Sequence, residues 1–185
     1  MQWTLPGTVL QIGPAETDRV EEVFSSMFLA GGMVLSQVTS LTGLEPPTVQ
    51  NWVKRGYLTA PKQKRYTQRQ LSRIMIINML RAALPLEQIC GLLQYVNGHL
   101  DDESDDLIDD TQLYFQFVHL AAYHRQMKNV QGRESYLEKV IEKYEEPVPG
   151  AKERVEKVLR IMLTAWAASQ LRLQAEAMVK DLDNI

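Results

Sequence analysis

The sequence has a single cysteine, Cys90, among its 185 residues. One cysteine cannot form an intrachain disulfide, and a cysteine-based zinc site needs more thiols than this chain has. No apolar run approaches the roughly 18 residues of a membrane helix, and the N-terminus lacks the basic and apolar regions of a signal peptide. We therefore expect a cytoplasmic protein that makes no contact with a membrane.

Motifs of catalysis are also missing. The chain has no Gly-rich phosphate loop, no G-x-S-x-G and no H-E-x-x-H. His119 and His124 stand five residues apart, which suits a shared metal on a helix less well than a spacing of four. We expect no enzyme, no metal and no cofactor, and no residue pattern supports a small-molecule effector, although one is left open.

The net charge of −3 hides a division along the chain. Residues 35–96 carry eight Lys or Arg and two Glu, a net charge of +6, whereas residues 97–110 carry seven acids and no Lys or Arg. A basic segment of domain size often contacts phosphate groups. The acidic run is interpreted as a solvated linker; its alternative interpretation is an acidic arm that faces the basic segment.

The apolar spacing is almost entirely that of helices. A helix begins near Thr17 and ends at Gly31-Gly32, and a short one spans residues 36–41 with Ser36 as N-cap. Another follows Glu45, with Pro46-Pro47 in its first turn, and ends at Gly56. Thr67 and Gln70 form a capping box before the next helix, and Pro85 starts the one after it. Three further helices are expected over residues 110–129, 134–146 and 151–182, while residues 61–66 form a loop or a small β-wing.

Two short helices around Thr42-Gly43 have the layout of a helix-turn-helix, whose second helix enters the major groove of DNA. Asn and Gln suit adenine, while Lys and Arg suit guanine or phosphate. Trp52 is assigned to the core, and Tyr66 either to the core or to a phosphate contact. The predicted DNA-contacting residues are Ser36, Thr48, Gln50, Asn51, Lys54, Arg55, Lys62, Lys64, Arg65 and Tyr66.

This stretch resembles the N-terminal domain of the MerR-type winged-helix regulators. The shared features are the T-G turn, the Thr48-Val49 pair, an aromatic at Trp52, the run Arg55-Gly56-Tyr57-Leu58 and the wing exit Arg65-Tyr66-Thr67. The variants NWVKRGYL and KRYTQRQL are closer to uncharacterised bacterial proteins with a MerR-like head and a helical tail. The resemblance implies a regulator that binds double-stranded DNA.

The chain also departs from the MerR pattern. It has Gln50 and Asn51 where the recognition helix usually carries Arg and Tyr, and Gln63 where a tyrosine usually precedes the wing arginines. Base contacts therefore cannot be transferred from that family. These departures, with the acidic net charge, favour an alternative function: a helical protein-interaction module that keeps the head fold without specific DNA binding.

The predicted fold is all-α, with a MerR-like winged helix-turn-helix head, a short β-wing, and a C-terminal helical bundle. Its divisions are an N-terminal helical extension (1–34), the head (35–98), the acidic linker (99–110) and the helical tail (111–185). The aromatic segment 114–124 is assigned to the core, with a ligand pocket as the alternative. The long last helix carries a stripe through Met162, Trp166, Leu173 and Leu182, which predicts a homodimer through residues 111–185.

Overall fold

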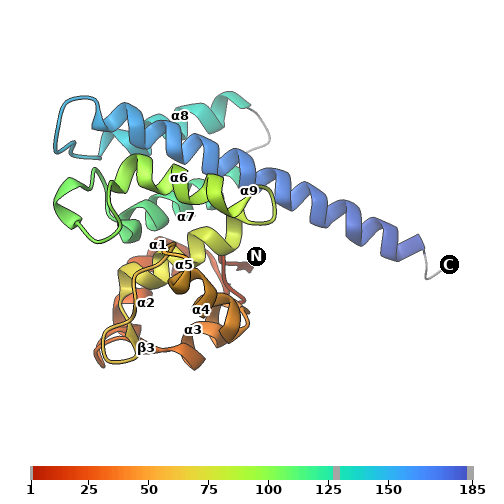
Figure 1. Ribbon diagram of the computed structural model, residues 1–185. Coiled ribbons are helices and arrows are strands. Elements are labelled where there is room, and N and C mark those ends of the chain that lie inside the picture. The colour runs from red at the N-terminus through yellow and green to blue at the C-terminus, as the bar shows by residue number, and fades with distance from the viewer. Residues whose placement is uncertain (1, 127–129, 183–185) are drawn as a thin grey trace.

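The computed structural model describes residues 2–126 and 130–182, and it is mostly helical (Figure 1). The coarse prediction of an all-α protein is confirmed. The helices are α1 (Pro14–Asp18), α2 (Val20–Met27), α3 (Leu35–Thr42), α4 (Pro46–Lys54), α5 (Gln68–Leu80), α6 (Leu86–Asn97), α7 (Asp110–Gln126), α8 (Val130–Glu142) and α9 (Ala151–Leu182), with a short 3₁₀ helix over Glu103–Asp105.

Four short strands accompany the helices. β1 (Trp3–Thr4) pairs with β2 (Gln11–Ile12), and β3 (Met33–Val34) pairs with β4 (Arg65–Tyr66), both antiparallel. Residues 61–66, predicted as a loop or a small β-wing, end in the strand β4, which pairs with the segment before α3, 31 residues earlier at Val34↔Arg65. Strands of two residues are too short for an alternating pattern, so the sequence carries no periodic signal for them.

The helix starts depend on local hydrogen bonds. The Thr67 hydroxyl accepts from the amide of Gln70 at 3.2 Å, and the Gln70 side chain accepts from the amide of Thr67 at 2.9 Å, so the capping box is confirmed. Ser36 is not an N-cap. The extended residue Val34, which pairs with Arg65, caps α3, and Gln37 accepts its N–H at 3.0 Å. The strand pairing thus sets where α3 begins.

The core is built around α5. Its residues from Leu71 to Ile77 are all buried, and α3, α6, α7 and α9 pack around it. The β1–β2 turn lies against the same helix: the Asn78 amide donates to the carbonyls of Gly7 and Thr42, at 2.9 Å each. The Tyr114 hydroxyl of α7 donates to the carbonyl of Pro6 at 2.7 Å. The N-terminal hairpin thus joins α3, α5 and α7.

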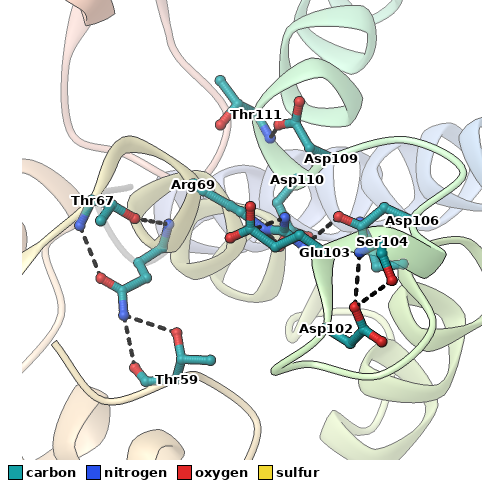
Figure 2. A network of polar contacts seen from close by, with 12 residues as sticks. Thr59, Thr67, Arg69, Asp102, Glu103, Ser104, Asp106, Asp109, Asp110 and Thr111 are labelled. Atoms are coloured by element: carbon teal, nitrogen blue, oxygen red, sulfur yellow. Dashed lines mark hydrogen bonds and ion pairs between the residues drawn. The ribbon is translucent and has the colours of Figure 1, made fainter. Parts of the chain in front are cut away.

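The acidic run is solvated only in its first part: residues 101–105 are exposed, whereas residues 106–110 are half-buried or buried. Figure 2 shows Arg69 of α5 among the carboxylates of this run, with Asp106 at 2.6 Å. Asp110, whose side chain is 2% exposed, pairs with Arg73 at 3.1 Å. The backbone N–H of Leu107 also donates to the carbonyl of Val96 at 2.7 Å. The buried carboxylates need the arginines to offset the loss of water, so the second part of the run packs against α5. The first part fits the solvated interpretation, and the second part fits the alternative of an acidic arm that faces the basic segment.

Helix α9 changes character along its length. Its first part is packed into the core through residues such as Val158, Met162 and Trp166, whereas every residue from Gln170 to Leu182 is exposed. Figure 1 shows this second part projecting beyond the other helices. The predicted stripe through Met162 and Trp166 is therefore not a continuous outer surface, since those two side chains already lie inside the molecule.

Candidate nucleic-acid interface

Two short helices, α3 and α4, lie on either side of a short turn where the sequence predicts a helix-turn-helix. Gly43 ends α3 with a left-handed backbone (φ 69°), which glycine adopts at little cost. The buried hydroxyl of Thr42 donates back to the carbonyl of Val38 at 2.8 Å. Pro46 and Pro47 then open α4, where a missing N–H costs least. The sequence thus places the turn and both helices correctly.

Helix α4 has one buried and one exposed side. Val49 and Trp52 are buried, at 0% and 3% exposed, so the assignment of Trp52 to the core is confirmed. Gln50, Asn51 and Lys54 are exposed, and Lys54 stands four residues after Gln50 and three after Asn51, so it neighbours both on this side. Thr48 is half-buried in the first turn. The exposed side therefore presents two amides and an ammonium to solvent.

The wing is a tight turn between Lys62 and Arg65. The N–H of Arg65 donates to the carbonyl of Lys62 at 2.9 Å, and the two central residues, Gln63 and Lys64, have φ of 51° and 61°. Positive φ at both central positions is the geometry of a type I′ turn, whose twist suits a β-hairpin. Neither residue is glycine or asparagine, so the turn carries strain. All four side chains are exposed.

A hollow of about 590 Å³ lies between α3, α4 and this turn, and we call it the head hollow. Ser36 of α3, Gln50 of α4 and Lys64 of the turn all line it. Val34, Val53 and Tyr66 supply apolar wall. Four of the predicted contact residues, Ser36, Gln50, Lys64 and Tyr66, thus line one depression in the surface.

Two predicted contact residues are held by contacts within the fold. Arg55 pairs with Glu87 of α6 at 2.8 Å and lies over the Tyr57 ring, 4.7 Å from its centroid. Hydrogen bonds from its own backbone and from Arg55 hold the pKa of Glu87 below its ordinary value. Tyr66 is 3% exposed, and burial raises the pKa of its hydroxyl. Of the two assignments considered for Tyr66, the structure supports the core.

Arg65 has a structural bond as well as an exposed side chain. Its guanidinium donates to the carbonyl of Gly32 at 2.9 Å, which ties the turn to the residue before β3. Arg69 and Arg73, counted in the basic segment, are held by Asp106 and Asp110. Among the predicted contacts, the basic groups of this face are therefore Lys54, Lys62, Lys64 and Arg65.

The aromatic segment belongs mainly to the core. Tyr114, Phe115 and Phe117 are buried, and the first two pack against Phe24 with ring centroids 5.9 and 5.7 Å apart. His119 and Tyr123 instead line a separate hollow of about 560 Å³ near Trp3. Within residues 2–126 and 130–182, no three His, Cys, Asp or Glu side chains are grouped as metal ligands would be.

The comparisons with known proteins identify a family without an assigned activity. The family described as "Domain of unknown function (DUF1836)" matches residues 18–117, just over half of the chain. The chain belongs to the DUF1836 family. The DUF1836 segment runs from the end of α1 into α7, across the predicted boundaries at residues 34, 98 and 110. It therefore holds both α3 with α4 and the acidic run that binds Arg69 and Arg73. The division into domains stays a prediction.

No curated protein and no solved structure matches the chain. In the part of the chain that the structure describes, no helix has both the length and the apolar character needed to cross a membrane. The functional inference therefore depends on the geometry of the site.

Proposed function

We propose that this protein is a DNA-binding transcriptional regulator that reads double-stranded DNA with α4 and the 62–65 turn. One observation carries the proposal: Ser36, Gln50 and Lys64 converge on the head hollow although they come from three separate elements. A helix-turn-helix uses this surface, with the second helix in the major groove and the flanking elements on the phosphates. The resemblance to MerR-type regulators points to the same use.

In this proposal, the exposed side of α4 reads bases. Gln50 and Asn51 carry amides that can bond the N6 and N7 atoms of adenine as a pair. Lys54, one turn later, reaches a guanine or a phosphate. Because Val49 and Trp52 anchor the opposite side of α4 in the core, the reading side chains have a fixed base.

The phosphate contacts come from the turn and from α3. Lys62, Lys64 and Arg65 are exposed on the turn and supply positive charge. The start of α4 is a poor phosphate site, because Pro46 and Pro47 have no N–H and the N–H of Thr48 is bonded to Glu45 at 3.0 Å. Helix α3 starts without a proline, so its first-turn amides and Ser36 are the better phosphate donors.

The proposal is tested by selecting bound duplexes from a random library with the full chain. Fluorescence polarisation at about 100 mM salt then compares a selected duplex with a scrambled one. We expect the selected duplex to bind about a thousandfold more tightly or better. Equal affinity for both duplexes would show that the chain is not a sequence-specific regulator.

Substitutions separate anchoring from reading. The double variant Lys62→Ala, Lys64→Ala should weaken every duplex and lower the salt slope by about one unit per lysine. Gln50→Ala should cost about 1–3 kcal/mol at one base pair and relax the preference there. The control Lys139→Ala, Lys143→Ala removes the same charge from the exposed surface around α8 and should leave binding unchanged.

A second candidate function is a protein-interaction module. It is favoured by the apolar wall of the head hollow, which Val34, Val53 and Tyr66 supply, and by the engagement of Arg55 with Glu87. Such a hollow would receive an apolar side chain of another protein. A library selection that yields no preferred duplex would favour this candidate over DNA binding.

A further inference from the structure

Helix α9 carries two apolar stripes. The inner one, which includes Val155, Val158, Met162 and Ala165, is buried in the core. A second set of positions alternates in steps of three and four residues, and all of its members are exposed. This outer stripe consists of Ile161, Thr164, Ala168, Leu171, Ala175, Met178 and Leu182.

The outer stripe has the spacing of a coiled-coil seam. In a heptad repeat labelled a to g, the positions that face the partner helix are a and d, which follow one another in steps of three and four residues. The large members are strongly exposed, at 45% for Ile161, 66% for Leu171, 64% for Met178 and 67% for Leu182. A row of this length without a cover is what a soluble protein avoids.

The projecting part of α9 also needs a partner for its own stability. From Gln170 to Leu182 the helix is exposed on all sides, and Figure 1 shows it standing clear of the other helices. Short helices gain most of their stability from packing, and an isolated helix below about 12–15 residues is unstable in water. A partner along the outer stripe supplies that packing.

We propose that the outer stripe of α9 pairs with the outer stripe of a second copy in an antiparallel coiled coil, centred between Leu171 and Ala175. The inference goes beyond the DNA contacts proposed above, and it holds whether or not the chain binds DNA. In this register, the numbers of any two residues that face one another across the seam add up to 346.

Side-chain size selects this orientation. In the antiparallel register, Leu171 faces the partner's Ala175, Met178 faces the partner's Ala168, and Leu182 faces the partner's Thr164. Each large side chain thus meets a small one, which fills space evenly along the seam. A parallel pair would place each alanine opposite another alanine between layers of paired Leu171 and Met178, and such thin layers leave voids.

A hollow at the far end of the stripe fits the same arrangement. Leu92 and Tyr95 of α6 and Ile161 of α9 line an apolar hollow of about 480 Å³. Tyr95 is 43% exposed there. In the antiparallel register the partner's Leu182 lies at the level of Thr164, less than one turn from Ile161. The end of the partner's α9 therefore reaches this hollow and covers it.

The pairing also spaces the two copies. The buried part of α9 has its middle near residue 160, and the centre of the pair is at 173. At about 1.5 Å per residue, the two bodies stand about 40 Å apart along the helix axis. This is of the order of the 34–36 Å between half-sites one turn apart on DNA.

Light scattering on the full chain tests the pairing. We expect twice the subunit mass of 21.2 kDa at micromolar concentration. The variant Leu171→Glu, Met178→Glu should have the single mass, with the helical circular dichroism of the compact body retained. The control Gln170→Glu, Ala177→Glu adds the same charges with the same spacing on exposed positions beside the stripe, and should remain a dimer.

The outcomes are decisive in each direction. A monomeric full chain, a larger oligomer, or a dimer that survives the Leu171 and Met178 substitutions would overturn the proposal. Loss of the dimer in the control variant as well would show that added charge, and not the stripe, is responsible. That result would also overturn it.

Disulfide formation tests the orientation, with Cys90→Ala as background. A mixture of the single variants Leu171→Cys and Ala175→Cys should form a mixed disulfide dimer on oxidation. Ala175→Cys alone should not cross-link, because the two copies of residue 175 are offset along the seam. Cross-linking of Ala175→Cys with itself, in preference to the mixed pair, would show a parallel coiled coil and overturn the antiparallel register.

Discussion

At the scale of single residues, Gly7 shows how closely the N-terminal hairpin packs on α5. Its φ is 76°, and a Cβ atom there would lie 2.2 Å from the carbonyl oxygen of Met75. Gly7→Ala therefore combines a left-handed backbone with a clash against a backbone atom that a buried helix cannot move. We expect a loss of more than about 2 kcal/mol in the free energy of unfolding, measured by urea denaturation.

Gly31 is the matched control for this substitution. It also has a positive φ, 85°, but nothing lies within 4 Å of the added Cβ. Gly31→Ala should lower the free energy of unfolding only by the cost of a left-handed backbone at a non-glycine residue, about 1–2 kcal/mol. Equal losses for the two variants would mean that the hairpin can shift on α5.

Asp106 should make stability depend on pH. Its side chain is 8% exposed, and its Oδ1 atom is buried without a hydrogen-bond partner. Burial raises the pKa of this carboxyl from 3.8 to about 6, although Arg69 acts in the opposite direction. Because this pKa is higher in the folded protein than in the unfolded chain, the folded protein holds the proton more tightly. The free energy of unfolding therefore falls as pH rises through the window from about 4 to 6.

Asp106→Asn removes this titrating group. The wild type should lose on the order of 2–3 kcal/mol between pH 4 and pH 7 through this carboxyl, and the Asn variant should lack that part of the slope. Chemical denaturation of both proteins at several pH values measures the difference. Parallel pH profiles would contradict the raised pKa. Below pH 4 the sign reverses for Asp102 and Asp105, because hydrogen bonds lower the pKa values of these two carboxyls in the folded protein.

At the scale of elements, α5 and α7 are joined by a buried ion pair. Both oxygens of Asp110 accept from Arg73, at 3.2 and 3.1 Å, and Arg73 also donates to the carbonyl of Tyr57 at 2.9 Å. Burial raises the pKa of Asp110, and the guanidinium groups of Arg73 and Arg69 counteract that rise. The pair therefore connects the head to the start of α7, and each of its two buried charges is stabilised by the other.

Removing one partner of this pair should be costly. Asp110→Asn leaves the buried Arg73 without its counter-charge, and we expect a loss of about 3–5 kcal/mol in the free energy of unfolding. Asp101→Asn, in the same acidic run but exposed, should change it by less than about 0.5 kcal/mol. Similar effects of the two substitutions would show that the run stabilises the fold through its overall negative charge and not through the contact of Asp110 with Arg73.

The elements that the sequence predicts are those with local signals. Thr67 with Gln70, the prolines before α4 and Gly43 each fix a helix end through residues within a few positions. Two other contacts join residues more than thirty positions apart: Val34 with Arg65, and Arg69 with Asp106. The residues around each position carry no pattern that identifies its partner. For the same reason, the sequence overcounts the basic face, since Arg55, Arg69 and Arg73 are paired with carboxylates of the same chain.

At the scale of the whole molecule, the charge division has a structural explanation. The acidic run and the basic segment meet at α5, where Arg69 and Arg73 pair with Asp106 and Asp110. These charges stabilise the fold and do not contribute to a free basic surface. What remains on the proposed interface is concentrated in Lys54 and the 62–65 turn. The net charge of −3 therefore gives little information about the potential at that face.

The two halves of α9 should respond differently to truncation. Removal of residues 151–185 takes Val158, Met162 and Trp166 out of the core, so the remainder should show no cooperative melting. Residues 171–182 are all exposed, so a chain that ends at Gln170 should remain folded.

Thermal melting followed by circular dichroism also connects this difference to the proposed pairing. The melting temperature of the full chain should rise with protein concentration, because only the folded state forms the dimer. The chain that ends at Gln170 lacks most of the outer stripe, so its melting temperature should be independent of concentration. A concentration-dependent transition in this shorter chain would place the contact between copies elsewhere on the molecule.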